Sequence, residues 1–227
     1  IPIIIPKILL IMTKMGTILM TNTNVIGKVK EPVRTLRLIQ TVAPKAIIAG
    51  GYFRDVYNDV PYSDVDIYVE FLHDDFRTTN ISDWKTLLKL KVDDYRSADD
   101  IHTLGTEDEP YDIPDDNNIM EVFGLVKNEI KYNIIVVENE PVDYVNAAFD
   151  FNICKNWCDG KRIRFPKEFM SDIENKTITV CDRKMSLGDF AHSMDVHLPK
   201  LKRKYPHHKL IVPEMHRDLH KKYKKNC

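Results

Sequence analysis

Two adjacent glycines between two short apolar runs constrain the fold of this chain more than any other feature. Residues 46–49 form an apolar run that leads directly into Gly50-Gly51, and residues 65–69 are rich in β-branched and aromatic residues with a period of two. Both runs are typical of strands. Residues 52–57 can form a short helix that starts directly after the glycines. The sequence therefore predicts the order strand, glycine turn, helix, strand.

Two aspartates lie at the start of the second predicted strand. Asp64 and Asp66 are two positions apart, so their side chains project from one face of a strand, while Val65 points into the core. Mg²⁺ prefers carboxylate, phosphate and water oxygens. Two metal ions about 4 Å apart fit between such groups and the phosphates of a substrate. The alternative for an isolated pair is an ordinary solvated strand face.

The glycine turn gives the aspartate pair a chemical context. Gly50 and Gly51 lack Cβ atoms, so their backbone N–H groups can approach a phosphate at the start of the following helix. A glycine pair alone is more often a simple tight turn. Followed in order by a helix and an acidic strand, it predicts a phosphate and metal site.

The stretch AGGYFRDVYNDVPYSDVDIYV resembles the head-domain motif of the polymerase-beta-like nucleotidyltransferases, especially the CCA-adding enzymes and bacterial poly(A) polymerases. That motif runs GGxxRD, a spacer, then DxDI. Downstream, FDFNICKNWCDG at 149–160 is similar to the family's RDFTINAL segment and its Asp-Gly turn. The resemblance covers about residues 46–165 and implies an α/β (α+β) fold with a mixed sheet flanked by helices.

The resemblance implies a role for each residue of the first motif. Asp64 and Asp66 would hold two Mg²⁺ ions, Gly50 and Gly51 would grip a nucleoside triphosphate, and Arg54 with Asp55 would brace or contact it. Such enzymes transfer a nucleoside monophosphate and release pyrophosphate. The expected acceptor is the 3′ end of a tRNA-like RNA. Transfer to a protein or small molecule, and an inactive nucleotide-binding protein of the same fold, stay open as alternatives.

The third carboxylate of the family's metal site has no clear counterpart. The neighbouring strand offers Asn133 at that position, which would cost one metal a ligand. Asp150, between Phe149 and Phe151, is the replacement that we favour as a catalytic residue. A buried Asp150 that braces the fold is an equal alternative. Phe149 stands where the family has Arg.

Several further elements follow from the pattern of apolar residues. We expect a helix over 33–43 that ends before Pro44, a helix that begins after Ser82, and an acidic mobile loop over 93–116. Strands are expected at 119–126, 130–137, 149–157 and 161–165, the last two joined by an Asp-Gly turn. The remainder, from Pro166, is expected to be mainly helical.

Charge is segregated along the chain, although the formal net charge is only −1. Residues 93–116 carry ten acidic groups and one Arg, whereas residues 197–227 carry ten Lys or Arg against two acids. A basic tail can neutralise RNA phosphates, or it can be a solvated face that balances the acidic loop. The predicted nucleic-acid-binding residues are Lys200, Lys202, Arg203, Lys204 and Lys209.

The sequence divides into three parts: an apolar leader or upstream extension at 1–19, a nucleotidyltransferase head at 20–165, and a basic helical tail at 166–227. The uncharged runs of the leader are too short to span a membrane. Four cysteines without a CxxC pair predict reduced thiols and a cytoplasmic protein, and they lack the ligand spacing of a zinc finger. Full CCA-adding enzymes carry a longer helical body, which suggests a reduced relative of viral or phage origin.

Overall fold

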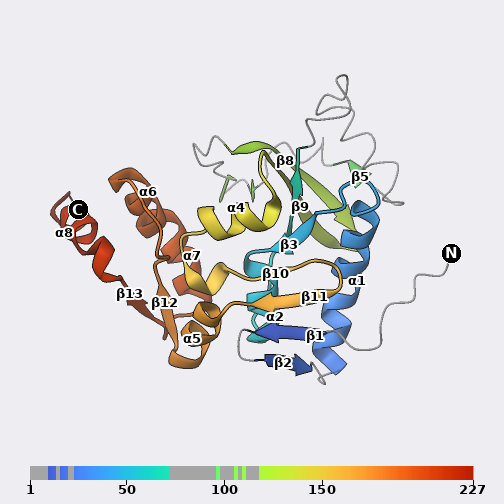
Figure 1. Ribbon diagram of the computed structural model, residues 1–227, viewed down its shortest axis with the longest axis horizontal. Helices are drawn as coiled ribbons and strands as arrows, with labels where there is room; N and C mark the ends of the chain where they lie inside the picture. Colours follow the sequence, from blue (N-terminus) through green and yellow to red (C-terminus); the bar gives the residue numbers. More distant parts are fainter. Residues whose placement is uncertain are drawn as a thin grey trace.

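The structure, a computed structural model, describes residues 10–13, 16–19, 23–71, 96–97, 105–106, 109–110 and 118–226. Its centre is a mixed sheet with the strand order β2-β1-β11-β10-β3-β4-β9-β8-β5. Helices lie on both faces of this sheet (Figure 1). The expected mixed α/β fold is confirmed.

The middle strands of the sheet set the register of the site. They are β3 (Ile47–Ala49), β4 (Val65–Glu70) and β9 (Ile130–Val137). β3 pairs antiparallel with β4, and β4 pairs parallel with β9. Asp66 consequently lies between Ala49 on one side and Asn133 on the other. The strands expected at 46–49, 65–69 and 130–137 are confirmed.

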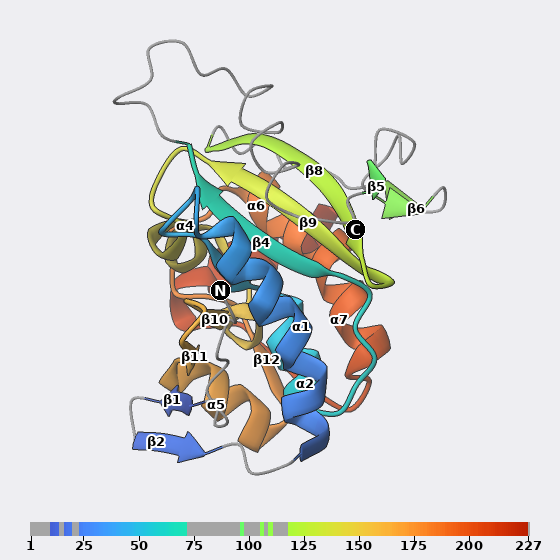
Figure 2. The ribbon, with the colours of Figure 1, turned by 90° about the vertical axis from the view of Figure 1, so that its right-hand side faces the viewer.

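Different helices cover the two faces of the sheet. Helices α1 (Thr23–Ile39) and α2 (Gly51–Tyr57) pack with Val65 and Ile67, which confirms that these side chains enter the core. Helix α4 (Pro141–Ala148) packs on the opposite face with Tyr68. Because side chains alternate along a strand, Asp66 shares its face with Tyr68 and not with the α1 side. Figure 2 shows α1 alongside β4, with β9 and β8 beyond β4.

Helix α1 differs from the expected helix over 33–43: it begins at Thr23, ends at Ile39 and contains Pro32. Proline has no N–H, so the Lys28 carbonyl, four residues earlier, lacks its helical donor. The hydroxyl of Tyr52 on α2 donates to this carbonyl at 2.9 Å. A tertiary hydrogen bond thus compensates for the proline and allows the helix to continue through it.

Residues 118–165 contain one wrong prediction. β8 (Ile119–Lys127) and β11 (Arg162–Phe165) confirm the strands expected there. The strand expected at 149–157 is wrong: a 3-10 turn, η2 (Asn152–Cys154), occupies its middle, and only β10 (Trp157–Cys158) is extended in the sheet. The Cys154 N–H donates to the Phe151 carbonyl at 2.9 Å. This local bond satisfies the backbone where a ladder partner was expected.

The N-terminal and acidic segments are described only in part. β1 (Leu10–Thr13) pairs parallel with β11 and antiparallel with β2 (Gly16–Leu19). Within the expected acidic loop, β5 (Arg96–Ser97) pairs with β8, and β6 (Gly105–Thr106) pairs with β7 (Glu109–Pro110). The loop is therefore not free of strands. The rest of it, and the helix expected after Ser82, lie outside the described residues.

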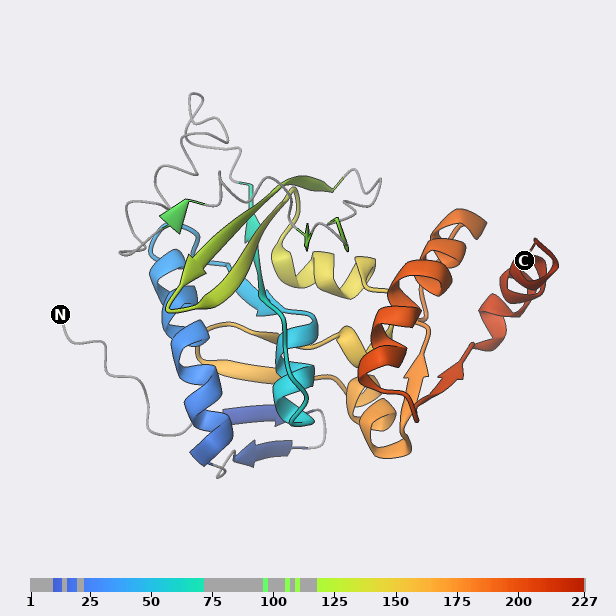
Figure 3. The same ribbon diagram turned by 180° about the vertical axis from the view of Figure 1, so that it is seen from behind.

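The tail beyond residue 165 is mainly helical, as expected, and gathers on one side of the head (Figure 3). A parallel strand pair within it was not predicted. Its elements are α5 (Lys167–Asn175), β12 (Thr177–Thr179), α6 (Leu187–His192), the π-helical turn η3 (Ser193–His197), α7 (Leu198–Lys204), β13 (Lys209–Ile211), η4 (Glu214–His216) and α8 (Arg217–Asn226). Within the described ranges, no helix is both long enough and apolar enough to span a bilayer.

The contact between Tyr52 and α1 yields a stability prediction. Replacing Tyr52 by Phe keeps the buried ring but leaves the Lys28 carbonyl without its donor. We expect Tyr52→Phe to lower the free energy of unfolding by about 1 kcal/mol, as measured by urea denaturation. The control is Tyr57→Phe, in the same helix, because the Tyr57 hydroxyl has no hydrogen-bond partner in the described part of the chain. Equal losses in the two variants would contradict the assigned role.

Candidate active site

Two carboxylates and one amide meet at the start of β4. Asp64 lies directly before the strand and Asp66 is its second residue. The Asn133 side-chain Nδ2 donates to Asp64 Oδ2 at 3.1 Å and to Asp66 Oδ1 at 2.8 Å. Ser63 Oγ also donates to Asp64 Oδ1 at 2.9 Å. The structure therefore brings Asp64 and Asp66 together and places Asn133 where a third carboxylate was sought.

The amide of Asn133 moderates the electrostatics of this pair. Burial, and after it the negative charge of Asp64, raises the pKa of Asp66 above its ordinary range. The hydrogen bond from Asn133 acts in the opposite direction, since it favours the ionised carboxylate. One amide thus holds two carboxylates close together that would otherwise repel each other.

The donor set at this point fits magnesium. Mg²⁺ in proteins is usually held by one or two carboxylates, with waters and substrate phosphates completing its shell. Asp64 and Asp66 supply two carboxylates from one strand, and Asn133 contacts both of them. No group of three or more His, Cys, Asp or Glu that could hold a metal is found among the described residues. A bound ion would therefore depend on oxygens from substrate and water.

The glycine turn lies directly against this carboxylate pair. Gly50 has φ +88°, a conformation that favours glycine, and a Cβ there would stand 3.2 Å from Asp66 Oδ2. A Cβ on Gly51 would stand 2.9 Å from Arg54 Nη2. Gly50 therefore needs glycine, whereas a side chain at Gly51 would displace the Arg54 guanidinium. The predicted phosphate turn and metal ligands are thus neighbours in space.

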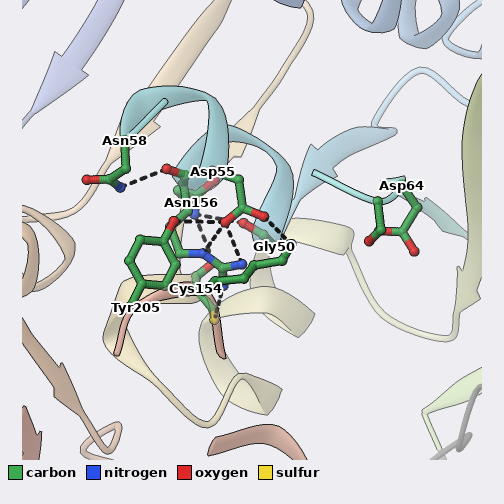
Figure 4. A network of polar contacts seen from close by, with 10 residues as sticks. Gly50, Asp55, Asn58, Asp64, Cys154, Asn156 and Tyr205 are labelled. Carbon is green, nitrogen blue, oxygen red and sulfur yellow. Dashed lines mark hydrogen bonds and ion pairs between the residues drawn. The ribbon is translucent and has the colours of Figure 1, made fainter. Parts of the chain in front are cut away.

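Arg54 and Asp55 are buried in the interior. Their side chains are 6% and 1% exposed, and Arg54 Nε and Nη2 both lie 2.7 Å from Asp55 Oδ1. Arg54 Nη1 donates to Cys154 Sγ at 3.1 Å. Figure 4 shows this network around Asp55, Cys154 and Tyr205, with Asp64 set apart from it. Of the two predicted roles, these contacts favour bracing the turn.

The tail completes the network around Asp55. Lys204 Nζ, at the end of α7, lies 2.5 Å from Asp55 Oδ2, and the Tyr205 hydroxyl donates to Asp55 Oδ1 at 2.9 Å. The Arg54 guanidinium also lies over the Tyr205 ring, 5.3 Å from its centroid. Two residues of the predicted basic tail segment, one of them a predicted RNA contact, thus bind the head domain.

The other predicted RNA-contacting residues divide into two groups. The Lys202 ammonium donates to the His208 carbonyl within the tail. Lys200 and Arg203 on α7, and Lys209 on β13, are exposed. RNA contact by these three residues stays a prediction.

Asp150 is engaged away from the carboxylate pair. Its Oδ1 lies 2.7 Å from Arg183 Nη2, and its Oδ2 lies 2.5 Å from His197 Nδ1. Burial acts to raise the pKa of Asp150, but the hydrogen bonds from His197 and Arg183 outweigh it and hold the pKa below its ordinary range. Both oxygens are occupied by tail residues, so the contacts favour the bracing role over that of a metal ligand.

Sequence reasoning missed two residues of this region. Tyr205 contacts Asp55, as described above, and Asn156 donates from Nδ2 to the Gly50 carbonyl at 2.9 Å. The available signal was a polar Asn156 directly before the Trp157-Cys158 strand. Tyr205 offered none, because its partner is 150 residues away.

Comparison with known proteins places this site in a known fold. No protein-family model matches the sequence, and no curated protein matches it either. Solved structures do match. A tRNA-processing enzyme in an apo form has a TM-score of 0.52 at 18% identity, over 87% of this chain and 46% of that one. The Thermotoga maritima CCA-adding enzyme complexed with tRNA has a TM-score of 0.51 at 13% identity, over 88% and 45%.

A third structure, a CCA-adding enzyme with ATP, has a TM-score of 0.54 at 13% identity, over 90% of this chain and 44% of that one. The chain therefore has the fold of the nucleotidyltransferase head domain of the CCA-adding enzymes. It spans less than half the length of these solved structures. They give no support to a viral or phage origin.

The buried network predicts a large cost for losing Asp55. Its removal leaves Arg54 and Lys204 without their carboxylate partner, so we expect Asp55→Ala to lower the free energy of unfolding by about 3–5 kcal/mol. Asp59→Ala is the control, because Asp59 is 89% exposed and its ion pair with Lys28 lies at the surface. That variant should leave stability close to that of the wild type, because ion pairs at the surface contribute little. Urea denaturation of both variants measures the difference. A similar loss in the free energy of unfolding in each variant would contradict a central role of Asp55 in the buried network.

Proposed function

We propose that this protein is a metal-dependent nucleotidyltransferase that transfers a nucleoside monophosphate from an NTP, most favourably to the 3′ end of a tRNA-like RNA. The observation that carries the proposal is the closeness of the glycine turn to the carboxylate pair: a Cβ added to Gly50 would stand 3.2 Å from Asp66 Oδ2. The fold of CCA-adding enzymes supports the same chemistry. Solved structures of this fold include complexes with ATP, CTP and tRNA.

Each residue of the site has a defined part in this proposal. Asp64 and Asp66 hold Mg²⁺, with two ions expected when the triphosphate is present, and the Gly50-Gly51 turn admits the phosphates. When bound, the metal neutralises phosphate charge and favours deprotonation of the attacking hydroxyl. Arg54 and Asp55 keep the turn in place from the interior. Catalysis then comes from positioning and charge neutralisation, without a covalent enzyme intermediate.

The proposed transfer needs no reactant besides the NTP and the acceptor hydroxyl. The oxygen of the acceptor hydroxyl forms a bond to the α-phosphorus of the NTP, and the bond from that phosphorus to the bridging oxygen breaks. Pyrophosphate leaves with the bonding electron pair, and the hydroxyl proton passes to solvent. The products are an acceptor extended by one nucleotide and pyrophosphate.

RNA is the favoured acceptor because the tail carries several exposed basic side chains. Lys200 and Arg203 lie on α7, and α8 adds Lys221, Lys222, Lys224 and Lys225, all of them exposed. Such a surface neutralises backbone phosphates and binds RNA with an affinity that falls steeply as salt rises. A protein or small-molecule acceptor would not need this surface.

A second function, nucleotide binding without turnover, is favoured by one observation. Asn133 occupies the place beside Asp64 and Asp66 where the family usually has a carboxylate. An amide adds no negative charge to a metal site. The fold would then serve as a nucleotide-binding or regulatory module.

Labelled nucleotides distinguish these functions. The protein is incubated with Mg²⁺, each labelled NTP in turn and total tRNA, and the fate of the label is followed. We expect label on RNA, reduced at least about a hundredfold in Asp64→Ala/Asp66→Ala because the metal ligands are lost.

The matched control is Asp59→Ala/Asp143→Ala, which removes the same number of carboxylates from exposed positions and should retain activity. Label on protein would select the alternative acceptor. Absence of transfer by a folded preparation that still binds MgATP would select the inactive binding module.

Asn133 permits a test that does not depend on activity. Asn133→Asp replaces the donor shared by Asp64 and Asp66 with a third carboxylate. Without metal, we expect it to lower the free energy of unfolding by about 1–3 kcal/mol, through lost hydrogen bonds and charge repulsion. Millimolar Mg²⁺ should restore much of that loss, as measured by thermal denaturation with and without the ion. The same loss at all Mg²⁺ concentrations would contradict a metal site at this point.

A further inference from the structure

Asn156 forms hydrogen bonds with both the N–H and the carbonyl group of Gly50 in the glycine turn. The Gly50 N–H donates to the Asn156 carbonyl at 3.3 Å, and Asn156 Nδ2 donates to the Gly50 carbonyl at 2.9 Å. The same Nδ2 also donates to the Cys154 carbonyl at 3.2 Å. Both backbone polar groups of Gly50 are therefore bound by a single residue.

The fold places Asn156 at this point. β10 pairs antiparallel with β3, with Trp157 opposite Ala49, so the chain directly before β10 runs past Gly50. The backbone bond between Gly50 and Asn156 extends this ladder by one step beyond β3. There the chain turns into α2, and the side-chain amide supplies a bond that no further strand residue provides.

The side-chain amide of Asn156 lowers stability in a way that an apolar residue at this position would not. It is completely buried, and its Oδ1 meets no donor within the described part of the chain. A buried acceptor without a partner lowers stability. An apolar residue of similar size would avoid this penalty, so the retained amide points to the bond that it makes to Gly50.

We propose that Asn156 is a positioning residue for nucleotide binding, which fixes the Gly50-Gly51 turn against the Asp66 carboxylate. This inference rests on the proposed function and adds to it a buried residue outside the first motif. Gly50 has φ +88° and ψ −137°, which a glycine can adopt among many other conformations, so the bonds to Asn156 select this one. If the turn is already ordered before the ligand binds, less of the binding free energy is lost in ordering it, and the affinity is higher.

The position of Asn156 also determines what it does not do. As it is completely buried behind the turn, it does not contact the base of a bound nucleotide. Its loss should therefore weaken the binding of every NTP to the same extent. A residue that contacts the base directly would instead show a preference among the four nucleotides.

Isothermal titration of MgATP, MgCTP, MgGTP and MgUTP into Asn156→Leu tests the proposal. We expect Kd to rise about tenfold for each nucleotide, the effect of losing one hydrogen bond that orders the site. The matched control is Asn58→Leu, because Asn58 Nδ2 donates to the Arg54 carbonyl at 2.8 Å at the other end of α2. This control removes the same kind of bond from the same helix and should leave Kd unchanged within about twofold.

The outcomes separate this inference from the proposed function. Wild-type protein that binds none of the four nucleotides overturns both. Wild-type binding with an unchanged Kd in Asn156→Leu, or with a loss confined to some bases, overturns the positioning role alone. If Asn156→Leu does not fold, amide hydrogen exchange of the free wild-type protein decides the point. A protected Gly50 N–H supports a turn ordered before binding, and rapid exchange there overturns it.

Discussion

The buried carboxylate of Asp55 is a main connection between head and tail, beside the contacts of Asp150 with Arg183 and His197. A charge removed from water is tolerated only when partners compensate for its lost hydration. Arg54 supplies one partner from the same helix, and Lys204 with Tyr205 supplies the others from the tail. Because α7 delivers a cation to the interior of the head, the tail is part of the same electrostatic unit. The glycine turn shares this support through Arg54, which lies against Gly51.

The carboxylate pair at β4 is stabilised in a different way from Asp55. Asp64 and Asp66 face Asn133, whose amide donates to both, so the two charges are held in place by a neutral group. A third carboxylate would bind cations more strongly but would add repulsion whenever no cation is bound. The amide shifts this balance toward a site that is ordered without metal. With a neutral amide in place of a third carboxylate, the protein also has less negative charge to attract a cation.

Local signals predicted the core of the site, and distant contacts account for what they missed. Alternation and adjacent glycines were sufficient for 46–49, Gly50-Gly51 and 65–69, since each is set by nearest neighbours. They failed at 149–157, where alternating aromatics suggested a strand but tail residues occupy both oxygens of Asp150. The sequence also does not show that Lys204 turns toward Asp55. Helix α4, which was not predicted, does have a local sequence signal, because Pro141 lies at its start.

The connection between Asp55 and Lys204 has a consequence for how the chain folds. These residues are 149 positions apart, so closing their contact restricts a long segment of chain. The strand–turn–helix–strand unit around Gly50 requires only local contacts and can form with little such cost. Until α7 docks, Asp55 is paired with Arg54 but lacks its bonds to Lys204 and Tyr205. A nascent chain that ends before residue 204 therefore contains β3, α2 and β4 without this connection to the tail. Full stability is thus reached only after residues 204 and 205 have been synthesised and α7 has docked.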